Sequence, residues 1–170
     1  MKSKTATHNG ASPMNGDAFR LEEFMPYRLS VAANRVSRLF ARRYNAAYGL
    51  SIPEWRVLAM VGRQGTLSPS AVGEATAMDK VKVSRAAASL VARGLLKQTH
   101  DPKDGRGRLL RLTRKGVTVH QGMVPLACEL EEQLAEGMSR TEWGSLLKAL
   151  DKLATYAEGF EGADSDALVD

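Results

Sequence analysis

Residues 68–116 decide the fold, and they are SPSAVGEATAMDKVKVSRAAASLVARGLLKQTHDPKDGRGRLLRLTRKG. The Ser-Pro pair at 68–69 predicts the start of a short helix that runs to about Ala77, because serine caps a helix and proline suits its first turn. A second helix is expected over 80–93, where Gly94 ends it. Two short helices joined by a tight turn form a helix-turn-helix.

The sequence pattern changes after Gly94. Residues 95–99 and 108–112 are short enough, and apolar enough, to be strands. Between them lies HDPKDGRG, residues 100–107, which is rich in turn-forming residues. A basic β-hairpin directly after a helix-turn-helix predicts a wing.

The flanking sequence is helical. Two capping boxes, Ser51 with Glu54 and Ser139 with Glu142, each predict a helix start. The expected helices lie at about 25–48, 52–61, 113–136 and 140–160. The predicted fold class is mainly α with a small β-hairpin, a winged helix-turn-helix with long flanking helices. Three regions are expected: a disordered tail (1–17), one domain (18–160) and an acidic tail (161–170).

Charge is distributed unevenly along the 170 residues. The net charge is +5. Residues 80–115 hold 11 basic and 2 acidic side chains, whereas 116–170 hold 3 basic and 11 acidic ones. The basic segment predicts a surface that binds nucleic-acid phosphates. The acidic segment is unsuited to DNA, and we expect it to have a function other than DNA contact.

Composition excludes several classes of protein. The single cysteine, Cys128, excludes an intrachain disulfide framework. The sequence contains no apolar run of the roughly 18 residues that a membrane helix needs, and the N-terminus is not a secretion signal. We therefore expect a cytoplasmic protein without a membrane partner. No nucleophile–base pair, metal-ligand spacing or phosphate loop is evident, so neither an enzyme, a metal site nor a cofactor is predicted.

The helix predicted over 80–93 has two faces. At about 100° per residue, Val83, Ala87 and Leu90 share one side with Ala86, which predicts a core face. Arg85 lies opposite, with Ser84 and Lys82 beside it and Lys80 in the first turn. An arginine there is suited to pairing with guanine in the major groove.

The wing supplies further cations. Arg106 lies between two glycines, so its side chain is expected at the tip, where it would enter the minor groove or hold phosphates. Hydroxyl or backbone N–H groups at Ser68 and Ser70 would meet phosphates. The predicted DNA contacts are Ser68, Ser70, Lys80, Lys82, Ser84, Arg85, Lys103, Arg106 and Arg108.

These residues resemble the MarR family of regulators. Asp101-Pro102-Lys103-Asp104-Gly105-Arg106 is similar to the family's wing pattern Asp-x-Arg-Asp-x-Arg, with Lys103 where arginine is usual. Leu110-Arg111-Leu112-Thr113-Arg114-Lys115-Gly116 is similar to its Leu-x-Leu-Thr-x-x-Gly ending. The resemblance implies a homodimer that binds a pseudo-palindromic operator in double-stranded DNA. A DNA-binding lobe would span about 50–115, and dimerisation helices about 25–48 and 113–160; a monomer core is the alternative use of their apolar stripes.

The resemblance also implies a repressor that a small effector releases. An arginine beside aromatic rings suits an aromatic or phenolic carboxylate, or its coenzyme A thioester. For the individual residues, a place in the core or in an ion pair is the alternative. The candidate effector residues are Tyr27, Arg28, Tyr44, Tyr48, Trp55, Arg56 and His120.

Two other functions stay open at this point. Cys128 would serve a thiol-based redox sensor, although Glu129, Glu131 and Glu132 around it disfavour a thiolate. A sequence-independent architectural DNA-binding protein would share the basic patch but would lack a defined base-reading helix.

Overall fold

The computed structural model describes residues 19–102 and 107–166, with side chains through Phe160. The expected disordered tail, the wing tip and the last four residues lie outside this part of the chain. The chain divides into two compact units at Leu39 and Phe40. The first unit holds a short 3-10 helix, Leu21–Glu23, and the N-terminal part of α1, Met25–Tyr48.

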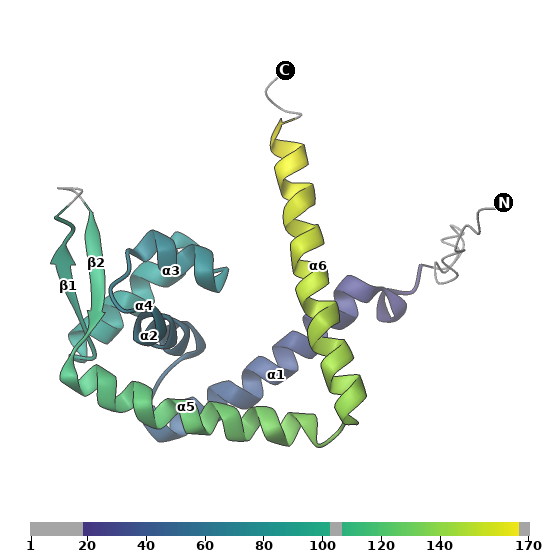
Figure 1. Ribbon diagram of the computed structural model, residues 1–170, viewed down its shortest axis with the longest axis horizontal. Coiled ribbons are helices and arrows are strands. Elements are labelled where there is room, and N and C mark those ends of the chain that lie inside the picture. The colour runs from purple at the N-terminus through teal and green to yellow at the C-terminus, as the bar shows by residue number, and fades with distance from the viewer. Residues whose placement is uncertain (1–18, 103–106, 167–170) are drawn as a thin grey trace, which may run out of the picture. The chain divides into compact units, whose positions relative to one another are not determined.

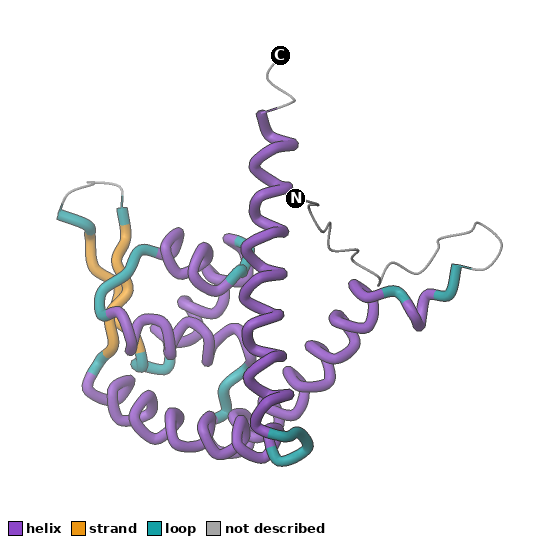
Figure 2. Tube along the Cα trace, turned by 45° about the vertical axis from the view of Figure 1, so that its right-hand side comes forward, coloured by secondary structure: helices purple, strands orange, loops and turns teal. Residues whose placement is uncertain are grey.

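The second unit begins within α1 and holds the remaining elements. They are α2 (Ile52–Gln64), α3 (Pro69–Thr76), α4 (Lys80–Ala92), β1 (Leu96–His100), β2 (Arg108–Leu112), α5 (Arg114–Ala135) and α6 (Arg140–Asp166). Figures 1 and 2 both show the β-hairpin beside α3 and α4. The predicted fold class, six helices with a wing, is confirmed.

The hairpin is antiparallel, and its register runs from Leu96 opposite Leu112 to His100 opposite Arg108. Leu67 extends the sheet by one bridge: its N–H donates to the carbonyl of Leu110 at 3.1 Å, and it accepts from the Leu110 N–H at 2.7 Å. This bridge ties the segment before α3 to the base of the wing.

One core holds the second unit together. Leu58 of α2, Leu90 of α4 and Leu110 of β2 are fully buried, and Tyr44 of α1 and Met123 of α5 join them. Burying a leucine side chain contributes about 2 kcal/mol. The core fixes α4 and the hairpin on the same scaffold.

The predicted helix starts are confirmed by their caps. The Ser51 hydroxyl accepts from the Glu54 N–H, and the Glu54 carboxylate accepts from the Ser51 N–H at 2.7 Å. The hydroxyl of Thr113 caps α5 by accepting from the Gly116 N–H at 3.0 Å.

The predicted end of α2 near Val61 is wrong. The helix continues through Gly62 to Gln64, and Gly65 with φ of 87° ends it. A Cβ on Gly62 would collide with the His120 ring. Gly62 is therefore a contact point for α5, not a helix stop.

The first strand starts one residue later than predicted. Gly94 takes a φ of 68°, and the Leu95 N–H donates to the Leu90 carbonyl at 2.9 Å, which closes the end of α4. Leu95 therefore belongs to the helix end, and β1 begins at Leu96.

Apolar stripes on the long helices differ in burial. On α5, Met123 and Leu130 are buried within the second unit. On α6, Leu146, Leu147 and Leu150 are exposed, as are α1 side chains such as Leu29 and Val36 in the first unit. Part of the α5 stripe thus serves the chain's own core, while these leucines of α6 are exposed.

Candidate nucleic-acid interface

Helices α3 and α4 are joined by a tight turn. Ala77 takes a left-handed conformation with φ of 49°, and the Asp79 side chain then caps α4 by accepting from the Lys82 N–H at 2.8 Å. The Met78 N–H donates to the Gly73 carbonyl at 3.1 Å. The turn is thus closed by local hydrogen bonds, which fixes the start of α4.

The two faces of α4 are those predicted from the sequence. Val83, Ala86, Ala87 and Leu90 are buried. Lys80, Lys82, Ser84 and Arg85 are exposed. The small Ala88 lies on the exposed side as well, which leaves room for a groove to approach the helix closely.

Lys82 is paired with the cap of its own helix. Its ammonium lies 2.9 Å from the Asp79 carboxylate, and both side chains are exposed. Hydrogen bonds from the Lys82 side chain and backbone lower the pKa of Asp79. Water and salt screen this exposed pair, so Lys82 is available to exchange Asp79 for a phosphate.

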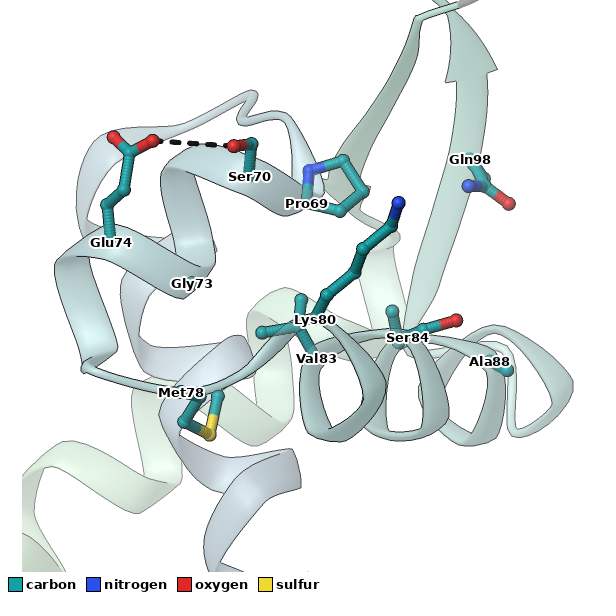
Figure 3. A pocket seen from close by; sticks show the side chains of 11 residues that line it. Pro69, Ser70, Gly73, Glu74, Met78, Lys80, Val83, Ser84, Ala88 and Gln98 are labelled. Atoms are coloured by element: carbon teal, nitrogen blue, oxygen red, sulfur yellow. Dashed lines mark hydrogen bonds between the residues drawn. The ribbon is translucent and has the colours of Figure 1, made fainter. Parts of the chain in front are cut away.

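A cavity of about 600 Å³ lies between α3, α4 and β1. Figure 3 shows Lys80 reaching up from the start of α4 between Pro69 of α3 and Gln98 of β1. Met78, Val83 and Ala87 supply apolar side chains to its lining. The cavity therefore has a polar rim of side chains from both helices and the wing.

Two polar rim residues were absent from the sequence prediction. Gln98 shares a strand face with the buried Leu96 two residues earlier, and that alternation was available as a signal. Glu74 accepts a hydrogen bond from the Ser70 hydroxyl at 3.3 Å (Figure 3). No sequence pattern singled out Glu74, because its role depends on where Ser70 points.

The other predicted DNA contacts, outside α4, differ in how exposed they are. The Ser68 hydroxyl is half-buried and accepts from the Ala71 N–H at 3.1 Å, so it is already used as the cap of α3. Arg108 is exposed at the start of β2, opposite His100. Lys103 and Arg106 lie outside the described residues. At the base of the tip, the Asp101 N–H donates to the Gly107 carbonyl at 3.0 Å.

Part of the chain matches a known protein family. Residues 48–107 match the MarR family model, and this match contains the helix-turn-helix and part of the wing. Over these residues the chain is similar to the MarR family. Its fold, a helix-turn-helix followed by a β-hairpin wing, resembles that of solved transcriptional regulators.

Three proteins illustrate what the chain as a whole is similar to. A probable transcriptional regulator from Pseudomonas aeruginosa is 29% identical with a TM-score of 0.71, over 79% of this chain and 99% of that one. BpsR of Bordetella bronchiseptica, whose DNA binding is regulated by 6-hydroxynicotinic acid, is 28% identical with a TM-score of 0.74, over 81% and 97%. The transcriptional repressor IacR of Pseudomonas putida is 24% identical over 79% of this chain and 80% of its own length.

The candidate effector residues lie in both units. In the first unit, Tyr27 and Arg28 line a cavity of about 320 Å³ with Arg35. In the second unit, the Tyr48 hydroxyl packs against Gly122, and the His120 ring packs against Gly62. These two side chains serve helix packing.

Trp55 and Arg56 line a groove of about 570 Å³ that α2, α3 and α6 form, together with Arg63 and the acidic residues Glu74 and Glu158. Arg63 lies seven residues, about two turns, after Arg56 and was absent from the sequence prediction. The groove combines an indole ring with two guanidinium groups and two carboxylates. Its arginines are suited to pairing with an anion, and its indole is suited to covering an apolar body.

Tyr44 is a core residue with an unsatisfied hydroxyl. Its ring lies 4.9 Å from Trp55 and 5.9 Å from Phe40 between centroids. Its hydroxyl is buried and has no hydrogen-bond partner among the described residues. Burial, together with the charge of Cys128, raises the pKa of Tyr44 to about 12.

In the described part of the chain, no cluster of three or more His, Cys, Asp or Glu side chains is arranged to hold a metal ion. None of the described helices has the length and apolar character needed to cross a membrane. Cys128 is exposed on α5.

Proposed function

We propose that this chain is a homodimeric repressor that reads a pseudo-palindromic operator with α4 and the wing. The observation that carries the proposal is the exposed face of α4, which holds Lys80, Ser84 and Arg85 while the opposite face is buried. A rigid helix of this width fits the major groove. The DNA-binding lobe is about 50–115.

Each predicted contact has a distinct role in this proposal. Arg85 pairs with a base edge, while Lys80, Lys82 and Ser84 hold the helix in the groove. Arg108 holds the backbone beside the wing, and Lys103 and Arg106 are proposed at its tip. Ser70 meets a phosphate near the start of α3; Ser68, whose oxygen already accepts from Ala71, has its hydroxyl proton to donate.

The dimer is proposed from uncovered apolar side chains. Leu146, Leu147 and Leu150 of α6 are between 37% and 42% exposed, although they form a stripe at helical spacing. A second copy of the chain would cover them. Two recognition helices would then face half-sites about 10 bp apart.

The effector is proposed to bind in the groove formed by Trp55, Arg56 and Arg63. The two guanidinium groups would pair with a carboxylate, and the indole would cover the apolar body of an aromatic acid or its thioester. The regulation of BpsR by 6-hydroxynicotinic acid, a planar aromatic anion, supports this ligand class. A ligand-dependent rise in melting temperature that Arg56→Ala abolishes would test the site.

Selection of duplexes from a random pool tests the DNA-binding function. The expected result is one enriched palindromic sequence, bound roughly 10³-fold or more tightly than a scrambled duplex at the same salt concentration. Equal affinity for both duplexes would instead establish a sequence-independent architectural protein and contradict the proposal. Sedimentation of the complex reports whether two chains bind each duplex.

A further inference from the structure

Glu54 lies at the start of α2 and is buried, with 9% of its surface exposed. One carboxylate oxygen accepts from both the N–H and the hydroxyl of Ser51, each at 2.7 Å. A capping box requires only this oxygen. The other carboxylate oxygen is directed at a different helix.

That second oxygen binds α4. It accepts a hydrogen bond from the hydroxyl of Ser89, which is 35 residues further along the chain. Ser89 follows Arg85 by one helical turn, so the two side chains leave α4 on nearly the same side, about 40° apart. Ser51, Glu54, Arg85 and Ser89 all line one small cavity between the two helices.

Arg93, the C-cap residue of α4, makes the second connection. Its guanidinium donates to the carbonyl of Gly49 at 3.0 Å and to that of Tyr48 at 2.7 Å, at the end of α1. It also lies 3.9 Å from the Glu54 carboxylate. A cation there is attracted by the partial negative charge at the C-terminal end of α1.

The backbone of Arg93 is held as well. Its carbonyl accepts from the Lys115 ammonium at 3.1 Å, and the adjacent Gly94 carbonyl accepts from the Thr113 hydroxyl at 2.6 Å. The end of α4 is therefore attached to the end of α1 and the start of α5.

The surroundings of Glu54 favour the ionised form of its carboxyl group. Burial raises the pKa of a carboxyl group, but hydrogen bonds from Ser89 and Ser51, with the charge of Arg93, outweigh it and lower the pKa of Glu54. The carboxylate accepts these bonds without carrying a proton of its own. A charge-assisted bond of this kind is stronger than a neutral one.

We infer that Glu54, Ser89 and Arg93 are positioning residues that set the rotation and tilt of α4, and hence the direction of Arg85. Ser89 fixes the rotation of the helix, and Arg93 fixes its end against α1. The inference rests on the proposed function, because it explains how α4 is aimed at an operator. Mutation of these residues will lower the preference for the correct sequence more than affinity for DNA in general.

Ser89→Ala is the most selective variant. It removes one hydroxyl, leaves the Ser51–Glu54 capping box in place, and alanine favours the helix. The matched control is Ser145→Ala, at an exposed position within α6. Arg93→Lys is the second variant, because an ammonium cannot reproduce the planar donor fork that reaches two carbonyls.

The measurement is the affinity for the selected duplex divided by that for a scrambled duplex. Both are determined at one salt concentration, well below each variant's melting temperature. For Ser89→Ala and Arg93→Lys we expect this ratio to fall about tenfold, while affinity for the scrambled duplex is retained because the phosphate contacts remain. Ser145→Ala keeps the parent ratio.

The outcomes separate the two proposals. If the parent selects no sequence from a random pool, the proposed function is wrong. If the parent selects an operator and both variants keep its ratio, the positioning role is wrong. An equal loss of affinity for both duplexes would also contradict it, since general destabilisation does not select between sequences.

Discussion

Helices α2 and α6 begin with the same sequence motif, but their side chains lie in different surroundings. Ser51-Ile52-Pro53-Glu54-Trp55 and Ser139-Arg140-Thr141-Glu142-Trp143 are both capping boxes followed by tryptophan. The bond from the serine N–H to the glutamate is 2.7 Å in the first and 2.8 Å in the second. The leucine three residues after each tryptophan differs sharply: Leu58 is 0% exposed and Leu146 is 37% exposed.

The difference shows which properties a local motif determines. A capping box sets where a helix begins, and both helices begin as the motif predicts. Burial depends on what the rest of the chain brings to the helix. Glu54 meets Ser89 of α4, whereas the described bonds of Glu142 are those of its own box.

The largest contrast is expected for the two leucines. Leu58→Ala empties a fully buried position and should lower the free energy of unfolding by about 3 kcal/mol. Leu146→Ala should lower the free energy of unfolding of a single chain much less, and it should weaken self-association instead. Chemical denaturation at two protein concentrations, with sedimentation equilibrium, distinguishes them. Equal losses of stability, independent of concentration, would show that Leu146 is covered within its own chain.

Glycines within the two helices give the next contrast. Gly62→Ala places a Cβ against the His120 ring and should destabilise the protein by about 2 kcal/mol. A Cβ on Gly144 of α6 meets nothing within 4 Å, so Gly144→Ala should stabilise the helix by up to about 1 kcal/mol. Thermal unfolding measures both. Combining Gly62→Ala with His120→Ala should recover part of the loss, and failure to do so would contradict the assigned contact.

The smallest effect concerns Tyr44, whose ring contacts the tryptophan of the first box. Tyr44→Phe removes a buried, unpartnered hydroxyl and should change stability at neutral pH by less than about 1 kcal/mol. An unfolded tyrosine loses its proton near pH 10, but folded Tyr44 does so only near 12. Folding stability of the parent therefore falls as pH rises through this window, and the phenylalanine variant lacks this contribution. Equal alkaline loss in both proteins would argue against burial of the hydroxyl.

Local signals predicted most of the fold. Serine, threonine, proline and glycine marked the helix starts, and alternation with turn residues marked the hairpin, because these effects act within a few residues. The buried and exposed faces of α4 also followed from spacing alone. The end of α2 did not, since Gly62 is explained only by the approach of His120 from a different helix.

The candidate site was predicted less completely. The exposed cations of α4 were found because they alternate with a core face. Gln98, Glu74 and Arg63 were missed, although each lies within one or two turns or residues of a position that the sequence had marked. The three-residue connection of Glu54, Ser89 and Arg93 was not visible, because it depends on contacts between distant segments. The effector residues were dispersed for the same reason: Tyr44, Tyr48 and His120 face the interior of the unit, while Trp55 and Arg56 share a groove.

The central claim is that the exposed face of α4 reads the operator. Its most direct test is the affinity of Arg85→Ala for the selected and the scrambled duplex at one salt concentration, with the exposed Arg140→Ala at the start of α6 as the charge-matched control. Loss of one base contact should lower the preference of Arg85→Ala roughly 10- to 100-fold, whereas Arg140→Ala keeps it. An unchanged preference in Arg85→Ala, or the same loss in both variants, would contradict the account.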